Sequence, residues 1–322
     1  MMSTRHEIAM IRGPVPAVHT PLDDAGESLR LDVIPGYLEH LRRQGAPAAY
    51  VCGSTGESLS LTVSERCRIL EAWVEAAGPD LPIIAHVGSN ALSDAIELAR
   101  HAAGIGVAAI SAMNPTFGRS RMVEDLVDFH ARIADAGDGT PYLIYEISAF
   151  GGVAFPASDV VETALKKVPT FAGMKFTSGD LLQLQLALDI AGNEDLAIFF
   201  GSDEHLLAGL VLGCRAAIGS TYGYAPGPAK AVFEAFEDGD SESARVAQRI
   251  IARLVVPLLR LGVLRSGKAL LSRVGVPVGP PRSPDRGLQP DELEELLLEI
   301  ASLDIDGLGE GWTDRSSVAG AV

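Results

Sequence analysis

The chain has 322 residues, 47% of them hydrophobic and 21% charged, so it is long enough to bury one large core. Its formal net charge of −16 disfavours nucleic acid as a partner, because an acidic surface repels a phosphate backbone. No apolar run approaches the roughly 20 residues that span a bilayer, and residues 1–10 are too polar for a signal peptide, so we expect a cytoplasmic protein with no membrane partner.

Short apolar runs alternate with helical patterns along most of the chain. The apolar runs cover residues 15–18, 48–52, 82–87, 108–112, 142–147, 171–176, 196–200 and 216–219. The helical patterns that follow them cover residues 31–43, 63–77, 93–103, 122–136, 157–167, 181–191, 204–212 and 228–236. Eight such units predict parallel strands with crossover helices, and therefore an α/β fold of the (β/α)8 TIM-barrel class. An open doubly wound sheet is disfavoured, because the first run ends in His19-Thr20-Pro21 without a glycine-rich turn.

After the eighth unit the pattern becomes purely helical. Helices are predicted at residues 242–260, 268–273 and 290–303. We expect residues 1–238 to form the barrel, residues 239–304 to form a C-terminal helical extension of the same domain, and residues 305–322 to form a flexible tail.

The polar residues that follow the predicted strands are the candidates for a functional site, since barrel active sites lie at the C-terminal ends of the strands. These candidates are residues 53–57, 145–146, 175–177, 201–204 and 219–222.

Lys175 is the first candidate for a catalytic residue, because it alone among the lysines lies inside an apolar strand. The other four stand in contexts that look solvated: Lys166, Lys167, Lys230 and Lys268. Burial disfavours an ammonium ion and leaves the free amine that forms a Schiff base with a keto acid. The alternative is an ion pair across the barrel with a strand-end carboxylate: Glu57, Glu146 or Asp203. The strand argument alone leaves both interpretations open.

The other candidates each allow a functional and a structural interpretation. Residues 53–56 could hold a small carboxylate with hydroxyls and backbone N–H groups, or form an ordinary turn with a helix N-cap. Tyr145 could act as an acid or base, or be a core aromatic residue. Asp203 and Glu204 could bind a polyhydroxylated substrate, or cap a helix.

We expect no metal site and no disulfide framework. The histidines that could be ligands share no spacing such as HExxH: His86, His101, His130 and His205. The cysteines are far apart, which is typical of reduced thiols: Cys52, Cys67 and Cys214.

Taken in chain order, these motifs resemble the N-acetylneuraminate lyase and dihydrodipicolinate synthase family of Schiff-base pyruvate aldolases. The resemblance extends over about residues 13–303, and the matching motifs are residues 53–57, Tyr145, residues 173–180, 201–204 and 219–222. Residues 59–66 and 278–282 look like the animal-type lyases of the N-acetylneuraminate lyase branch. The synthase branch is disfavoured, because Phe150 stands where that branch usually has an arginine.

The resemblance implies a class I aldolase, a carbon–carbon lyase that cleaves or forms a 2-keto-3-deoxy sugar acid such as N-acetylneuraminate. Its substrates would be pyruvate and an aldehyde or sugar, it would need no cofactor because a lysine supplies the electrophile, and it would be a homotetramer. The implied catalytic residues are Lys175 for the imine, Tyr145 for the proton of the 4-hydroxyl, and Ser54 and Thr55 for the keto-acid carboxylate. The implied substrate-binding residues are Gly53, Glu146, Phe150, Thr177, Gly201, Asp203, Glu204 and Ser220.

Several residues depart from the family pattern. Glu146-Ile147-Ser148 replaces the common Asn-Ile-Pro, and the added carboxylate could favour a substrate that bears an amine. Phe117 stands where many members have a tyrosine that reaches into a neighbouring subunit, and Gly223 replaces a frequent asparagine. Two alternatives therefore stay open: an aldolase or dehydratase for a different 2-keto acid, and a non-catalytic keto-acid sensor on the same barrel.

Overall fold

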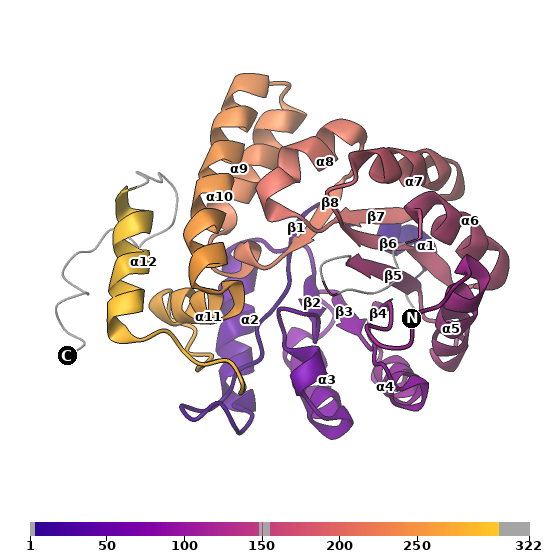
Figure 1. Ribbon diagram of the computed structural model, residues 1–322, viewed down its shortest axis with the longest axis horizontal. Coiled ribbons are helices and arrows are strands. Elements are labelled where there is room, and N and C mark those ends of the chain that lie inside the picture. The colour runs from indigo at the N-terminus through magenta and orange to yellow at the C-terminus, as the bar shows by residue number, and fades with distance from the viewer. Residues whose placement is uncertain (1–3, 148–149, 151–154, 303–322) are drawn as a thin grey trace.

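Eight parallel strands form one sheet that curls into a barrel (Figure 1). The computed structural model describes residues 4–147, 150 and 155–302. Hydrogen-bonded strands follow the order β1-β8-β7-β6-β5-β4-β3-β2. A parallel bridge between Ala17 and Tyr50 joins the two outer strands, and the Val18 N–H donates to the Tyr50 carbonyl at 3.0 Å. The predicted (β/α)8 TIM barrel is confirmed.

The strands and helices alternate along the chain. The strands are β1 (Gly13–Pro16), β2 (Ala49–Val51), β3 (Ile83–His86), β4 (Ala109–Met113), β5 (Tyr142–Ile147), β6 (Phe171–Thr177), β7 (Ala197–Phe200) and β8 (Ala216–Gly219). The helices around them are α2 (Ile34–Arg43), α3 (Val63–Ala77), α4 (Leu92–Gly104), α5 (Val123–Ala136), α6 (Ala157–Lys167), α7 (Leu181–Glu194), α8 (Leu206–Leu212) and α9 (Pro226–Glu237).

The sheet buries both of its faces. In β5, Leu143 and Tyr145 belong to the cluster that fills the barrel interior, whereas Tyr142 and Ile144 pack with the helices outside. Alternate residues of a strand point to opposite faces, so a strand covered on both sides is apolar throughout. This explains why the strands are continuous apolar runs in the sequence.

A bulge lies between β5 and β6. Tyr142 is paired with Phe171, but the next residue, Leu143, is paired with Gly173. Ala172 is therefore an extra residue on β6, and every later residue of β6 is shifted by one position relative to β5.

The bulge decides which side chain of β6 stands opposite Tyr145. With the shift this residue is Lys175, and without it the residue would be Met174. A slip of one residue exchanges the two faces of a strand, so the bulge directs Lys175 into the barrel. Gly173 permits the bulge, because its φ is +139° and a Cβ there would lie 1.9 Å from the carbonyl oxygen of Ala197.

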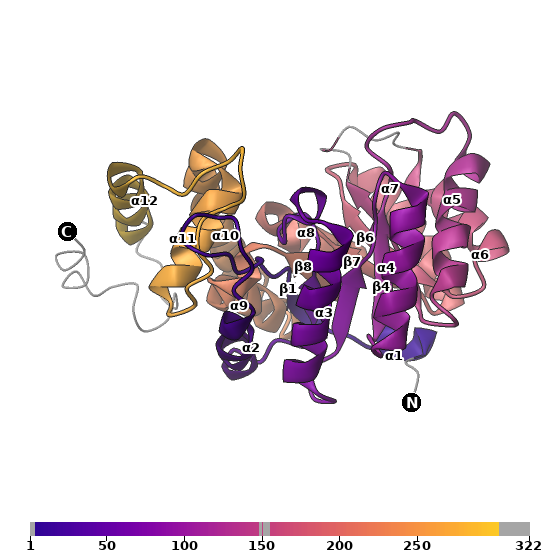
Figure 2. The same cartoon turned by 90° about the horizontal axis from the view of Figure 1, so that it is seen from below.

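The C-terminal extension consists of α10 (Ser241–Leu261), α11 (Val263–Arg273) and α12 (Pro290–Ser302). Both views place these helices on one side of the barrel, away from α5 and α6 (Figures 1 and 2). The connection between α11 and α12 returns to the barrel, where the Leu22 N–H donates to the Val278 carbonyl at 2.9 Å.

Several elements differ from the prediction in their bounds or were not predicted. β1 begins at Gly13, because it pairs with β8 from that residue onward. α11 begins at Val263, well before the predicted position 268, and its Gly267 lets the helix approach His19, whose Nε2 would lie 2.6 Å from a Cβ. The short helix α1 (Arg5–Ala9) was not predicted, although Thr4 and Glu7 form a capping box.

Two negative findings apply to the part of the chain that the structure describes. None of its helices is long and apolar enough to cross a membrane. Nor do these residues contain a group of three His, Cys, Asp or Glu side chains that could hold a metal ion.

Three histidines are fully enclosed: His19, His86 and His130. Burial lowers the pKa of His19 and of His130 to about 3, and Lys268 adds to the effect at His19. His130 bridges the barrel wall and α5, with Nδ1 2.6 Å from the Tyr142 hydroxyl and Nε2 2.9 Å from the Asn114 side-chain oxygen.

We expect the protein to lose stability in acid because of His19 and His130. His19 and His130 titrate near 6.5 when unfolded and near 3 when folded, so the unfolded chain binds more protons between these pH values. Their contribution to the free energy of unfolding is fully present above pH 6.5 and is lost as the pH falls toward 3. We expect each to cost about 1.4 kcal/mol at pH 5.5 relative to pH 7.5, measured by urea denaturation. His130→Gln should lower this pH dependence by the same amount, and an unchanged dependence would contradict the assignment.

Candidate active site

Lys175 and Tyr145 lie side by side near the C-terminal ends of β6 and β5. Lys175 is 3% exposed, and its Nζ is 4.1 Å from the ring centroid of Tyr145 and 4.4 Å from that of Tyr50. The amine is thus held against two aromatic faces inside the barrel. The prediction that Lys175 is buried is confirmed.

The strand-end carboxylates that were the alternative partners of Lys175 are engaged elsewhere or face away. Glu57 forms an ion pair with Lys268, and Asp203 accepts hydrogen bonds from Thr221. Glu146 stands opposite Phe176, on the outer face of the sheet. The ion-pair interpretation of Lys175 therefore finds no support in these contacts.

Lys268 corrects one prediction. It was expected to be solvated, yet its side chain is 1% exposed. The expectation was wrong because residues 263–273 form a longer helix than the sequence pattern indicated, and this helix packs against the barrel.

The loop after β2 brings a hydroxyl to Tyr145. Ser54 Oγ lies 3.2 Å from the Tyr145 hydroxyl, and either oxygen could donate the hydrogen bond. Thr55 follows Ser54 and is also half-buried. Gly53 has to be a glycine, because a Cβ there would lie 2.5 Å from Cε1 of Tyr50. The structure thus places Ser54 beside Tyr145 and Gly53 beside Tyr50.

Tyr50, Ser111 and His86 complete this side of the site, and the sequence did not single out the first two. The Tyr50 hydroxyl donates to Ser111 Oγ at 3.1 Å, and burial raises the pKa of Tyr50 well above its usual value. The His86 ring packs edge-on against Tyr145, with ring centroids 6.0 Å apart. Alternate residues of a buried barrel strand point inward, and this alternation could have identified Tyr50 as an inward-facing side chain.

His86 has a defined tautomer. Its Nε2 accepts from the Met113 N–H at 3.1 Å, so Nδ1 carries the proton and donates to the Cys52 carbonyl at 2.9 Å. Burial and the neighbouring Arg66 guanidinium hold the pKa of His86 well below its usual value. Arg66, itself buried, donates to the carbonyls of His86 and Gly88 at 2.7 and 2.9 Å, and so fixes the end of β3.

The ends of β6, β7 and β8 form the opposite side. Thr177 and Asp203 fit there because their neighbours are glycines: a Cβ at Gly201 would lie 1.9 Å from Thr177 Oγ1, and one at Gly219 would lie 1.8 Å from Asp203 Oδ1. Thr177 Oγ1 and Asp203 Oδ1 are buried and have no hydrogen-bond partner among the described residues. Both can therefore bind a hydroxyl group of a substrate.

Thr221 binds one of the two oxygens of Asp203. Asp203 Oδ2 accepts from the Thr221 N–H at 3.0 Å and from the Thr221 hydroxyl at 2.7 Å. Burial raises the pKa of Asp203, an effect that these hydrogen bonds and Lys175 oppose. Ser220, half-buried at the end of β8, precedes Thr221. The Glu204 side chain is 41% exposed and lies 3.8 Å from His205, so it is less closely associated with this group.

The chain matches the Dihydrodipicolinate synthetase family over residues 10–302. It belongs to that family. N-acetylneuraminate lyase of Sus scrofa is 36% identical over 299 residues, which cover 92% of this chain and 93% of that protein.

Two solved structures agree with this assignment. The Proteus mirabilis N-acetylneuraminate lyase is 32% identical, with a TM-score of 0.87 over 91% of this chain and 98% of that one. A Ruminococcus gnavus sialic acid aldolase, described as a catalytic lysine mutant, is 28% identical, with a TM-score of 0.85 over 94% of this chain and 98% of that one. This dihydrodipicolinate synthetase family member therefore lies in the N-acetylneuraminate lyase branch and is a carbon–carbon lyase.

Glu146, which departs from the family pattern, faces away from Lys175. Glu146 lines a cavity of about 240 Å³ outside the barrel wall, with Phe155, Phe176 and Gln183 among its neighbours. In this family member the added carboxylate thus lies on the opposite face of the sheet from Lys175 and Tyr145, because it is one residue after the inward-facing Tyr145. Phe150 is 45% exposed, and Ser148 lies outside the described residues.

Phe117 is 84% exposed on the loop after β4. Asn90 holds this loop, since its side-chain oxygen accepts from the N–H groups of Thr116 and Phe117 at 2.8 and 3.1 Å. The side chain of Phe117 is therefore presented at the surface on a fixed backbone.

Proposed function

We propose that this chain is a Schiff-base aldolase that cleaves or forms a 2-keto-3-deoxy sugar acid, with N-acetylneuraminate as the first candidate substrate. The observation that carries the proposal is the buried Lys175 amine beside Tyr145, whose hydroxyl lies 3.2 Å from Ser54 Oγ. A scaffold protein has little reason to enclose an amine against two tyrosine rings.

In the cleavage direction, Lys175 Nζ attacks the C2 carbonyl, Tyr145 gives its proton to the departing hydroxyl, and loss of water leaves an iminium and the Tyr145 phenolate. Tyr145 takes the proton of the 4-hydroxyl, the C3–C4 bond breaks, and its electron pair enters the iminium to give an enamine and an aldehyde. Protonation of the enamine at C3 and hydrolysis of the imine release pyruvate and restore the amine. Ser54 can pass a proton to or from Tyr145 through their hydrogen bond.

Two buried oxygen atoms favour a substrate that carries several hydroxyl groups. Asp203 Oδ1 and Thr177 Oγ1 are enclosed and have no partner among the described residues, so a hydroxyl-bearing chain would satisfy both. Ser54 and Thr55 would hold the carboxylate of the keto acid, with Gly53 keeping the backbone close.

The test measures two events separately. Borohydride reduction in the presence of pyruvate should add the mass of a reduced imine to the peptide that contains Lys175. Incubation with N-acetylneuraminate should release pyruvate. Trapping with turnover of a different 2-keto-3-deoxy acid would identify another aldolase or dehydratase, and trapping without any turnover would favour a keto-acid sensor. Absence of trapping would exclude the imine chemistry.

We also propose that the enzyme works as a homotetramer in the cytoplasm. Exposed apolar side chains support an assembly: Phe117, Leu182 and Val256 are 84%, 66% and 62% exposed, on three different parts of the surface. The three cysteines are free thiols, as in a reducing compartment. Light scattering on the eluting protein tests the assembly, and a monomeric mass would exclude it.

A further inference from the structure

A buried ion pair joins the loop after β2 to the C-terminal extension. Lys268 Nζ, on α11, lies 2.6 Å from Glu57 Oε1, and the two side chains are 1% and 2% exposed. The ammonium also donates to the Pro280 carbonyl at 2.8 Å. Burial of a single charge without a partner is costly, so these two residues depend on each other.

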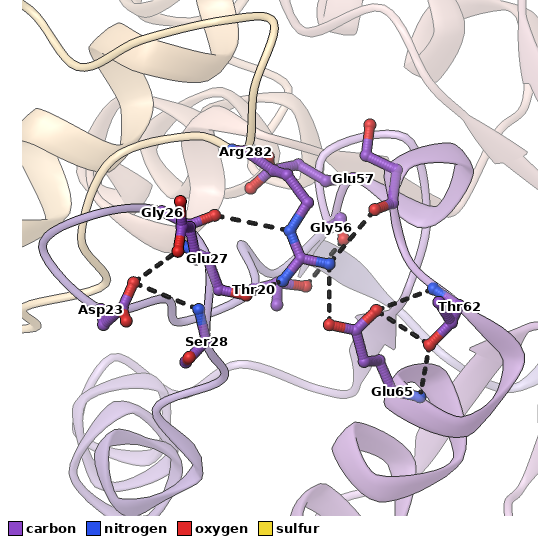
Figure 3. A network of polar contacts seen from close by, with 11 residues as sticks. Thr20, Asp23, Gly26, Glu27, Ser28, Gly56, Glu57, Thr62, Glu65 and Arg282 are labelled. Atoms are coloured by element: carbon purple, nitrogen blue, oxygen red, sulfur yellow. Dashed lines mark hydrogen bonds and ion pairs between the residues drawn. The ribbon is translucent and has the colours of Figure 1, made fainter.

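Both oxygens of Glu57 are held by the extension. Oε2 accepts from the backbone N–H of Arg282 at 2.7 Å (Figure 3). Oε1 faces Lys268. Glu57 is thereby fixed from α11 and from the segment between α11 and α12.

The guanidinium of Arg282 also bonds to the neighbouring loops (Figure 3). It donates from Nη1 to Glu65 Oε1 at 2.7 Å and from Nη2 to the Glu27 carbonyl at 2.6 Å. Glu65 in turn closes the capping box that begins α3. One arginine of the extension thus ties together the elements on both sides of the loop.

The loop needs such support, because its backbone is strained at both ends. Cys52 and Glu57 are not glycines, yet their φ values are 57° and 60°, in the left-handed region. Thr20 adds a further bond, from its hydroxyl to the Gly56 carbonyl at 2.7 Å. Ser54 lies between the two strained residues, so its position relative to Tyr145 depends on how the loop is held.

We propose that Glu57, Lys268 and Arg282 are positioning residues, through which the C-terminal extension holds Ser54 and Thr55 in place for the keto-acid carboxylate. The inference rests on the proposed function and adds a role for the extension in substrate binding.

The test compares pyruvate with methyl pyruvate, which has the same ketone but no carboxylate. In Lys268→Met we expect the pyruvate concentration for half-maximal borohydride trapping at Lys175 to rise about tenfold or more. The maximal trapping rate and the trapping of methyl pyruvate should change much less. Adding Glu57→Gln to Lys268→Met should recover part of the pyruvate affinity, because no uncompensated charge remains. Lys167→Met is the matched control. It removes a half-buried lysine at the end of α6, which pairs with Asp128 at 2.7 Å and lies away from the C-terminal extension.

Equal losses with both ketones, or unchanged half-saturation by pyruvate, would overturn the proposal. If Lys268→Met does not fold, Arg282→Gln keeps the test available, because it retains the backbone N–H that binds Glu57. Hydrogen exchange of residues 53–60 gives a readout without chemistry, and it should rise in either variant. Wild-type protein that traps no pyruvate would refute the proposed function, and the exchange measurement would still decide whether the extension holds the loop.

Discussion

Lys175→Ala is expected to abolish imine formation and to lower the rate of cleavage by about 10⁴-fold or more, because the covalent route is lost. No other lysine can replace it: Lys268 is the other enclosed lysine, and its ammonium is taken up by Glu57. Fold stability should be little changed or slightly raised, since the substitution removes a polar group from an apolar strand.

The measurement is intact mass after incubation with pyruvate and borohydride, together with pyruvate release from the best substrate. Lys167→Ala serves as the control, because Lys167 is a partly exposed residue in an ion pair with Asp128. A reduced adduct in the Lys175→Ala protein at the wild-type level would refute the assignment of the nucleophile.

Tyr145→Phe is expected to lower kcat by about 10²- to 10⁴-fold, the usual contribution of a positioned acid or base. The ring that covers Lys175 remains, whereas the hydroxyl that bonds to Ser54 is removed. Trapping of pyruvate should therefore persist in this variant, although more slowly, because imine formation also moves protons.

Tyr50→Phe is the matched comparison for Tyr145→Phe. Its ring also lies against Lys175, but its hydroxyl donates to Ser111 inside the barrel. We expect a loss in kcat of less than about tenfold. Equal losses in the two variants, or a Tyr145→Phe protein that retains full kcat, would show that proton transfer to the substrate does not depend on Tyr145.

The expected dependence of activity on Lys175 and Tyr145 follows from their register. They stand opposite each other because Ala172 is an extra residue in β6. Gly173 is the residue that allows this arrangement, since any side chain there would meet the carbonyl of Ala197. The geometry of the site thus depends on a position that carries no functional group.

Local patterns in the sequence were enough to predict most of the helices and strands and several of the residues around Lys175. Residues 63–77, 142–147 and 157–167 form the predicted helix, strand and helix, because burial on one or both faces imposes a local periodicity. The barrel followed from the number and alternation of such units. The position of Lys175 within an apolar strand was likewise enough to predict that its amine is buried.

How these residues face one another depends on contacts that form only in the folded barrel. The bulge at Ala172 arises from pairing between strands, and no local pattern in the sequence of β6 predicts it. Glu146, adjacent to Tyr145, points to the other face of the sheet. Lys268 looked solvated, yet it is enclosed with Glu57, more than 200 residues earlier in the chain. Periodicity and capping are local properties, whereas register and ion pairing depend on contacts between distant segments, which exist only after the barrel has closed.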